Sequence, residues 1–266
     1  MMPGMNAQPG LDPAARHADS ARRLVLTRYP DALGAVLGGS CARGRAAPGS
    51  DLDISVLLPD DGFSRREVVR HEGRVAEVFL NSRANLREIF AEDRETRRAT
   101  AMFLYGESVV LYDPDGRAEA LRAEARALLD AGPDPLTADE RAYGRFLLTD
   151  LLDDLTETGP GSDRHEQLAV ADRLLREAAH FLTAHHLAWD GAGKWLPRRL
   201  KAAEPVLGEE LLRGHLAVAE QADPEPLAQA VHRVLELLGG PLREGYVGIR
   251  RAQPPPAADV RAADRC

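Results

Sequence analysis

The stretch that decides the fold reads Val36-Leu-Gly-Gly-Ser-Cys-Ala-Arg-Gly44 and resumes as Gly49-Ser-Asp-Leu-Asp-Ile-Ser-Val56. Residues 33–37 form a short apolar run that ends in two glycines and a serine, which predicts a buried strand entering a tight turn. After a loop rich in arginine, alanine and glycine, residues 51–58 form a second run that ends at a proline. We therefore expect two strands joined by a glycine turn and a loop.

Two acidic side chains lie at the beginning of this second strand. Because side chains alternate between the faces of a strand, Asp51, Asp53 and Ser55 share one face, whereas residues 52, 54, 56 and 58 are apolar and face the core. Neighbouring carboxylates repel each other, and burial strengthens that repulsion. A divalent cation relieves it, and carboxylate oxygens suit a hard ion such as Mg²⁺. The acidic pair therefore predicts a magnesium site.

The glycine turn just upstream has the character of an anion-binding site. Glycines at positions 38 and 39 permit a tight turn whose N–H groups converge on an anion, and Ser40 adds a hydroxyl donor. A short helix beginning at Ser40 would favour phosphate further through its dipole. An anion site beside a carboxylate pair is the arrangement expected for a metal–triphosphate complex.

A third carboxylate, Glu77, lies within the apolar run of residues 75–80. A charged group in such a run needs a partner. Phosphoryl transfer with two metal ions commonly uses a further ligand or a base, and Glu77 is the candidate for that role. The alternative is a structural salt bridge between Glu77 and Arg74 or another arginine.

Together, these residues carry a resemblance to the DNA polymerase beta superfamily of nucleotidyltransferases. The pattern is a hydrophobic strand, Gly-Ser, a spaced Arg-Gly and then Ser-Asp-x-Asp-hydrophobic, and it is similar to the small bacterial aminoglycoside and minimal nucleotidyltransferases. The resemblance extends over about residues 20 to 115. It implies that Gly39 and Ser40 bind the phosphates of a nucleoside triphosphate and that Asp51 and Asp53 hold Mg²⁺. Glu77 would be a further metal ligand or the base that activates an acceptor hydroxyl.

Three further residues are candidates for contact with the nucleotide. Arg43 and Ser50 lie within the matching motif, and for Arg43 an ion pair with an acidic residue is the alternative. In the small antibiotic-modifying members, a lysine from a helical region can meet the triphosphate. Lys194, in the segment Gly-Lys-Trp-Leu-Pro of residues 193–197, is our candidate for this contact. The alternative for it is an ordinary surface lysine.

The chain divides near Ala131-Gly-Pro-Asp-Pro135, where turn-forming residues interrupt the pattern. We expect an α+β protein with a nucleotidyltransferase domain of mixed sheet and flanking helices over residues 1–130. A helical bundle follows over 137–250, and a disordered tail over 251–266. The elements expected in the first part are a helix from about residue 12, a hairpin of 67–71 and 74–80, helical spacing around 86–90, a strand over 109–112 and a helix over 117–129. The second part reads as helices over 137–156, 166–186, 195–203, 206–221 and 225–238.

The composition and charge of the chain limit the classes of partner that we expect. The 266 residues are 44% hydrophobic and 29% charged, with a formal net charge of −8. Apolar runs are too short for a membrane helix and the start lacks a secretory pattern, so we expect a cytoplasmic protein without a membrane partner. The mixed charges do not favour a nucleic-acid partner, whereas an acidic cleft would suit a cationic acceptor such as an aminoglycoside. The oligomeric state stays open, a dimer included.

The sequence therefore predicts a magnesium-dependent enzyme that transfers AMP from ATP to a hydroxyl group of an acceptor and releases pyrophosphate. One alternative is an antitoxin-like regulatory nucleotidyltransferase that modifies or binds a protein or tRNA partner. Another is a degenerate domain that senses nucleotide without catalysis, against which the intact Ser40, Asp51 and Asp53 count.

Overall fold

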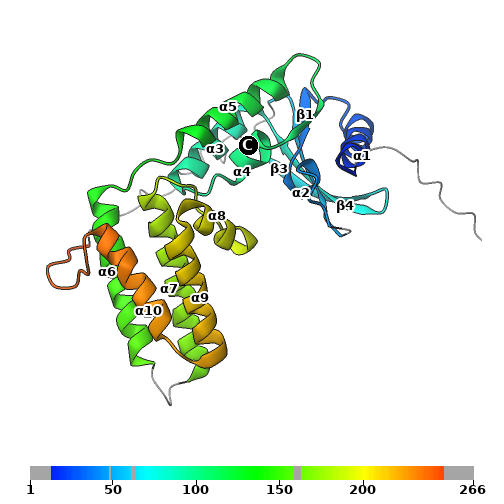
Figure 1. Ribbon diagram of the computed structural model, residues 1–266. Coiled ribbons are helices and arrows are strands. Elements are labelled where there is room, and N and C mark those ends of the chain that lie inside the picture. Colours follow the sequence, from blue (N-terminus) through cyan, green and yellow to red (C-terminus); the bar gives the residue numbers. More distant parts are fainter. Residues whose placement is uncertain (1–12, 48, 61–63, 159–162, 249–266) are drawn as a thin grey trace, which may run out of the picture.

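The computed structural model describes residues 13–47, 49–60, 64–158 and 163–248. It confirms the α+β class: a five-stranded mixed sheet with helices forms the N-terminal part, and a helical region follows (Figure 1). The tail expected over residues 251–266 lies outside the described residues. No helix of the described part combines the length and the apolar character needed to cross a membrane.

The sheet has the strand order β3-β4-β2-β1-β5. The parallel pair is β2 (Leu52–Leu57) with β4 (Arg74–Asn81), and the other neighbours are antiparallel. The remaining strands are β1 (Gly34–Leu37), β3 (Arg65–His71) and β5 (Val109–Tyr112), so that β3 and β5 form the two edges. All five strands lie within a few residues of the runs that the sequence predicts.

Both faces of β2 are covered, although only one face of its sequence looks apolar. On one face, Leu52, Ile54 and Val56 pack with α1 (Pro13–Arg28). On the other face, Leu57 joins a second cluster formed with α3 (Arg83–Glu95), α4 (Thr100–Gly106) and α5 (Arg117–Ala131). Ser55, which shares the face of Asp53, is buried and shares a 2.7 Å hydrogen bond with the hydroxyl of Tyr105. The polar face of β2 is therefore open only at its N-terminal end.

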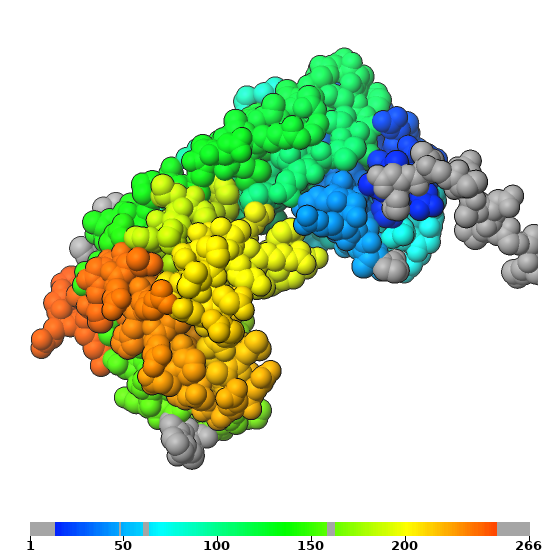
Figure 2. Space-filling view, viewed as in Figure 1, coloured from blue at the N-terminus to red at the C-terminus, as the bar shows by residue number. Residues whose placement is uncertain are grey.

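The helical region has a leucine-rich core of its own. It consists of α6 (Ala138–Glu157), α7 (Arg164–His185), the short helix η1 (Gly193–Trp195), α8 (Leu196–Ala203), α9 (Pro205–Gln221) and α10 (Glu225–Leu238). A capping box of Thr137 and Glu140 begins α6 where the sequence places a cap residue. In Figure 1, η1 and α8 extend from this region toward the sheet, and Figure 2 shows the outline of the molecule hollowed between the two parts.

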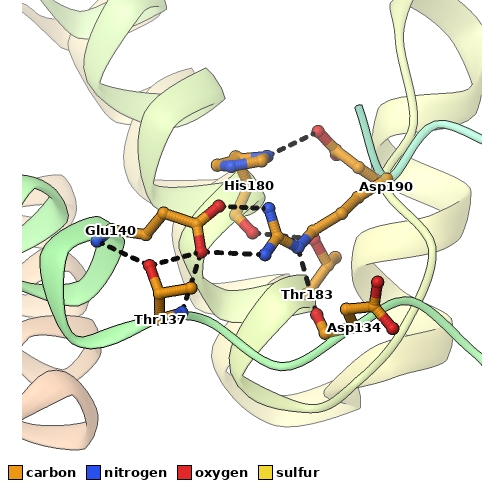
Figure 3. Close-up of polar contacts among 7 residues, drawn as sticks. Asp134, Thr137, Glu140, His180, Thr183 and Asp190 are labelled. Atoms are coloured by element: carbon orange, nitrogen blue, oxygen red, sulfur yellow. Dashed lines mark hydrogen bonds and ion pairs between the residues drawn. The ribbon is translucent and has the colours of Figure 1, made fainter. Parts of the chain in front are cut away.

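The two parts meet at Arg97, which is buried, and Figure 3 labels its partners Glu140 and Asp190. The guanidinium of Arg97 donates to both carboxylate oxygens of Glu140, at 2.8 and 3.1 Å, and the backbone oxygen of Arg97 accepts a 2.8 Å bond from the N–H of Asp190. A ring nitrogen of His180 lies 3.2 Å from the carboxylate of Asp190. These contacts fix the segment between α7 and η1 against the sheet part, and so they set where η1 lies.

Candidate active site

Three carboxylates converge where β2 and β4 lie side by side. The register of this parallel pair places Asp53 directly beside Glu77, and Asp51 immediately precedes β2. One carboxylate oxygen from each of the three residues lies within 4.8 Å of the others. Asp51 is exposed, whereas Asp53 and Glu77 are half-buried. Three hard oxygen donors at this separation fit the ligand preference of a divalent cation such as Mg²⁺.

The pKa of Asp53 shows that the nearby cations do not offset the charge of the three carboxylates. Burial raises the pKa of Asp53 from 3.8 to about 6, and the nearby carboxylates of Asp51 and Glu77 add to the rise. The charges of Lys194 and Arg43 act in the opposite direction. A bound cation would reverse the effect of the neighbouring carboxylates, so the unfavourable environment of Asp53 is the second feature that fits a metal site.

Glu77 has an arginine partner, but it is not the arginine named first from the sequence. Its carboxylate forms an ion pair with Arg66 of the neighbouring strand β3, and its side chain is 15% exposed. Arg74 instead donates a 3.1 Å hydrogen bond to the backbone oxygen of Ser50. Arg74 therefore supports the loop before the acidic pair, while Arg66 contacts the carboxylate itself.

The glycine turn packs directly on the acidic strand. The N–H of Gly38 donates to the backbone oxygen of Asp53 at 2.8 Å, and Gly39 has φ +65°, in the left-handed region that favours glycine. The thiol of Cys41 lies 3.1 Å from the backbone oxygen of Asp51. The helix α2 (Gly39–Ala42) begins one residue earlier than expected and has four residues, so its dipole is small. The turn thus brings Gly39 and Ser40 beside the carboxylates.

The structure gives Ser50 and Arg43 partners within the protein. The Ser50 hydroxyl accepts a 2.9 Å bond from the N–H of Ala47 and so shapes the loop. Arg43 donates to the carboxylate of Glu107 at 2.5 Å, and its guanidinium lies 4.9 Å from the centre of the Trp195 ring. Arg43 therefore forms an ion pair with an acidic residue, and its contact with the nucleotide stays a prediction.

Lys194 and Trp195, both on η1, bring the helical region to the site. Lys194 is exposed and close enough for its charge to lower the pKa of Asp53. The Trp195 ring lies 5.0 and 5.2 Å from the guanidinium groups of Arg198 and Arg199, in addition to Arg43. Sequence reasoning missed Trp195 and Glu107 as partners of Arg43, because nothing in the local pattern signals contacts between residues so far apart in the chain.

Two hollows of the described residues lie away from the acidic cluster. One is lined by Leu33, Leu58 and Pro59, at the opposite end of β1 and β2 from the acidic cluster. The other lies between α9 and α10. Neither hollow is lined by the three carboxylates. The convergence of the charged groups, and not a hollow, therefore marks the candidate site.

Comparison with known proteins agrees with the chemistry of this cluster. The family model described as the nucleotidyltransferase domain matches residues 19–102, a range that contains the glycine turn and all three carboxylates. Among solved structures, a nucleotidyltransferase-like protein from Exiguobacterium sibiricum 255-15 aligns with a TM-score of 0.44 and 12% identity, over 83% of this chain and 74% of that one. No curated protein matches the chain significantly. Residues 19–102 thus match the nucleotidyltransferase domain family, and the helices from α6 onward lie outside that match.

Proposed function

We propose that this protein is a magnesium-dependent nucleotidyltransferase that transfers a nucleoside monophosphate, AMP from ATP, to a hydroxyl group of an acceptor with release of pyrophosphate. The observation that carries the proposal is the convergence of Asp51, Asp53 and Glu77 beside the glycine turn, inside the segment that matches the nucleotidyltransferase domain. Each of these residues is of the type that the proposed chemistry requires at its position.

The three carboxylates would hold Mg²⁺ together with the nucleotide. When bound, the cation supplies charge neutralisation on the phosphate oxygens and makes the α-phosphorus a better electrophile. Gly39 and Ser40 would hold the phosphates from one side. Lys194 would hold them from the helical region, which is supported by its electrostatic effect on Asp53. Arg43 and Ser50, which lie within the same motif, would also contact the nucleotide.

In the transfer step, the acceptor oxygen forms a bond to the α-phosphorus. The bond from the α-phosphorus to the oxygen shared with the β-phosphate breaks, and pyrophosphate leaves with that electron pair. The acceptor proton passes to a base, and Glu77 would take this role or that of a further metal ligand. The Glu77 carboxylate also forms an ion pair with Arg66 of β3, which holds its position on the sheet.

We propose that the two parts of the chain have different roles. Residues 1–130 form the nucleotidyltransferase domain, and the helices of residues 137–250 close over the nucleotide and select the acceptor. The contacts of η1 to Arg43 support this proposal, because they join the helical region to the sheet part next to the carboxylates. The cytoplasmic location and a dimeric state remain predictions.

The test is transfer from ATP labelled at the α-phosphate, in the presence of Mg²⁺, to aminoglycosides, lincosamides, tRNA and lysate proteins. Label on a small molecule supports the enzyme of the kind proposed, and label on protein or tRNA selects the antitoxin-like regulatory alternative. The double variant Asp51→Asn with Asp53→Asn should keep the fold and lose transfer. Full activity of a folded double variant would remove the argument from the carboxylates.

A further inference from the structure

One face of the hairpin formed by β3 and β4 has no helix over it. The opposite face is covered by α1: Tyr29 and Arg28 bond to Glu67, and Ser20 bonds through its backbone oxygen to His71. The other face of the hairpin is uncovered and is here called the open face. Its residues alternate along both strands with those of the covered face. The open face consists of Arg66, Val68 and Arg70 of β3 with Val75, Glu77 and Phe79 of β4.

The exposure of its side chains shows that the open face is bare. Val68 is 67% exposed and Val75 is 38% exposed, although both are apolar. The cluster beneath α3, α4 and α5 takes residues from β1, β2 and β5, and none from β3 or β4. The helix α4 packs against β1 and β2, and α5 packs against β1 and β5. An apolar surface left bare beside a reaction centre is a candidate for ligand contact.

The open face is continuous with the acidic site through Glu77. Across the antiparallel pair, Val68 lies directly opposite Glu77, and Arg70 lies opposite Val75. Along β4, Val75 and Phe79 flank Glu77 on the same side of the strand. A molecule that lies on Val68, Val75 and Phe79 therefore places its edge at Glu77, beside Asp53.

The charge on the open face is basic away from Glu77. Arg66 is 64% exposed, contacts Glu77 and lies 5.5 Å from the centre of the Phe79 ring. Arg70 is exposed, and it forms no ion pair with any residue in the part of the chain that the structure describes. Charged residues on an edge strand also discourage pairing with other chains, but that purpose does not require an exposed Val68 between the two arginines or an exposed Val75 opposite Arg70. The complementary ligand has an apolar part and a negative charge.

We infer that the open face binds the acceptor, and that the acceptor carries a hydroxyl group, an apolar ring and an anionic group such as a phosphate. The inference rests on the proposed function and deepens it. The ring lies on Val68 and Phe79, the anionic group meets Arg70, and the hydroxyl faces Glu77. This class of acceptor differs from the cationic one that an acidic cleft would suit, because Arg70 gives the open face a positive charge that no described acidic residue pairs with.

The experiment uses the full chain with Mg²⁺ and ATP labelled at the α-phosphate. Four acceptors are compared: a nucleoside 5′-monophosphate, the same nucleoside without phosphate, a short single-stranded RNA with a free 3′ hydroxyl, and the aminoglycoside tobramycin. The nucleoside pair isolates the anionic group, and the RNA separates a polymer end from a free phosphate. Binding of a non-hydrolysable ATP analogue with Mg²⁺, measured by calorimetry, reports on the nucleotide site separately.

The matched variants are Arg70→Glu on the open face and Arg22→Glu on the exposed side of α1. Both reverse the charge of an exposed arginine, but Arg22 belongs to the helix that covers the opposite face of the sheet. We expect Arg70→Glu to raise the KM for the anionic acceptor by roughly three- to tenfold, in line with an exposed charge contact whose sign is reversed. Arg22→Glu should leave that KM unchanged, and neither variant should alter the affinity for the ATP analogue.

The outcomes separate this inference from the proposed function. Label on the nucleoside monophosphate or the RNA, with sensitivity to Arg70→Glu, supports it. Label on tobramycin, equal label on the uncharged nucleoside, or no label on any anionic acceptor while the ATP analogue binds overturns this inference alone. Failure of the protein to bind the ATP analogue with Mg²⁺ overturns the proposed function and this inference with it.

Discussion

A Cβ atom added to Gly39 would lie 1.8 Å from Oδ2 of Asp53. The turn and the carboxylate are therefore in contact with no room for a methyl group. The backbone of Gly39 is also in the left-handed region, with φ +65°. The same glycine that permits the turn thus permits the position of Asp53, so the turn and the acidic strand act as one unit.

Gly39→Ala should displace the carboxylate of Asp53 and so weaken both metal binding and transfer. The left-handed backbone adds about 1–2 kcal/mol of destabilisation for any residue with a Cβ. Gly44→Ala is the matched control, because Gly44 has the same φ of +65° and nothing within 4 Å of an added Cβ. Without metal, both variants should lose unfolding free energy, and Gly39→Ala should lose more because its Cβ also meets Asp53. Only Gly39→Ala should lose the stabilisation by Mg²⁺. Equal Mg²⁺ responses would contradict the contact.

The raised pKa of Asp53 predicts a pH dependence of stability without metal. Because the folded pKa of about 6 exceeds the ordinary value of 3.8, the folded state holds the proton more tightly than the unfolded state. Stability contributed by the protonated group is present below pH 4 and is lost as the pH rises through 6. Asp53→Asn removes this loss, so the variant should gain on the wild type by about 1–2 kcal/mol between pH 4 and 7, a value reduced for solvent screening.

Magnesium should offset that loss in the wild type. Above pH 6 the wild type has an ionised Asp53 and gains stability from bound cation, by about 1.4 kcal/mol when its concentration is ten times the dissociation constant. Asp53→Asn should show little gain. Urea unfolding at pH 4, 5, 6 and 7, with and without MgCl₂, measures both effects. A wild type whose stability relative to Asp53→Asn is the same at every pH would show that Asp53 is not perturbed.

Lys194 and Lys201 are the two lysines of the chain, which makes a matched comparison possible. Lys194→Met should raise the dissociation constant of a non-hydrolysable Mg-ATP analogue by roughly tenfold, the equivalent of about 1.4 kcal/mol, because a charge beside the phosphates is lost. Lys201 pairs with Glu209 at 3.6 Å, and Lys201→Met should leave that affinity unchanged. Titration calorimetry distinguishes the two, and equal affinities would assign Lys194 to the ordinary surface.

Away from the site, we expect the largest loss of stability when Arg97 is replaced. Its side chain is 9% exposed, and it holds the pKa of Glu140 at about 2. Arg97→Met removes the charged partner of Glu140, which keeps only its bonds to Thr137, and should cost about 2 kcal/mol of unfolding free energy. This is less than for a fully buried pair because Glu140 is 40% exposed. Arg94→Met, which breaks the exposed pair with Asp134, should cost under about 0.5 kcal/mol. Denaturant unfolding of both variants measures the difference, and similar losses would contradict a special role for Arg97.

The strands and the acidic residues could be predicted from the sequence because they depend on local patterns of residues. The alternation of apolar and polar residues, together with the turn residues, predicted the five strands. The motif from Gly39 to Asp53 pointed to the carboxylates that the structure brings together. The helix α4 escaped notice because the chain enters it through Arg97 and Ala99, two residues in the left-handed region without any glycine to signal a turn. The partners of Glu77 and Arg43 could not be chosen either, because many arginines and acids compete and only the packed fold decides among them.

The parallel alignment of β2 and β4 has a consequence for how such a site can evolve or fail. A slip of one residue between these strands would turn Glu77 toward α1, into the layer where Ala76 and Val78 are fully buried. An ionised group there would have no water and no partner, at a cost of several kcal/mol. Misaligned chains are therefore penalised before any substrate arrives, and the selection that keeps the protein folded also keeps its acidic residues in place.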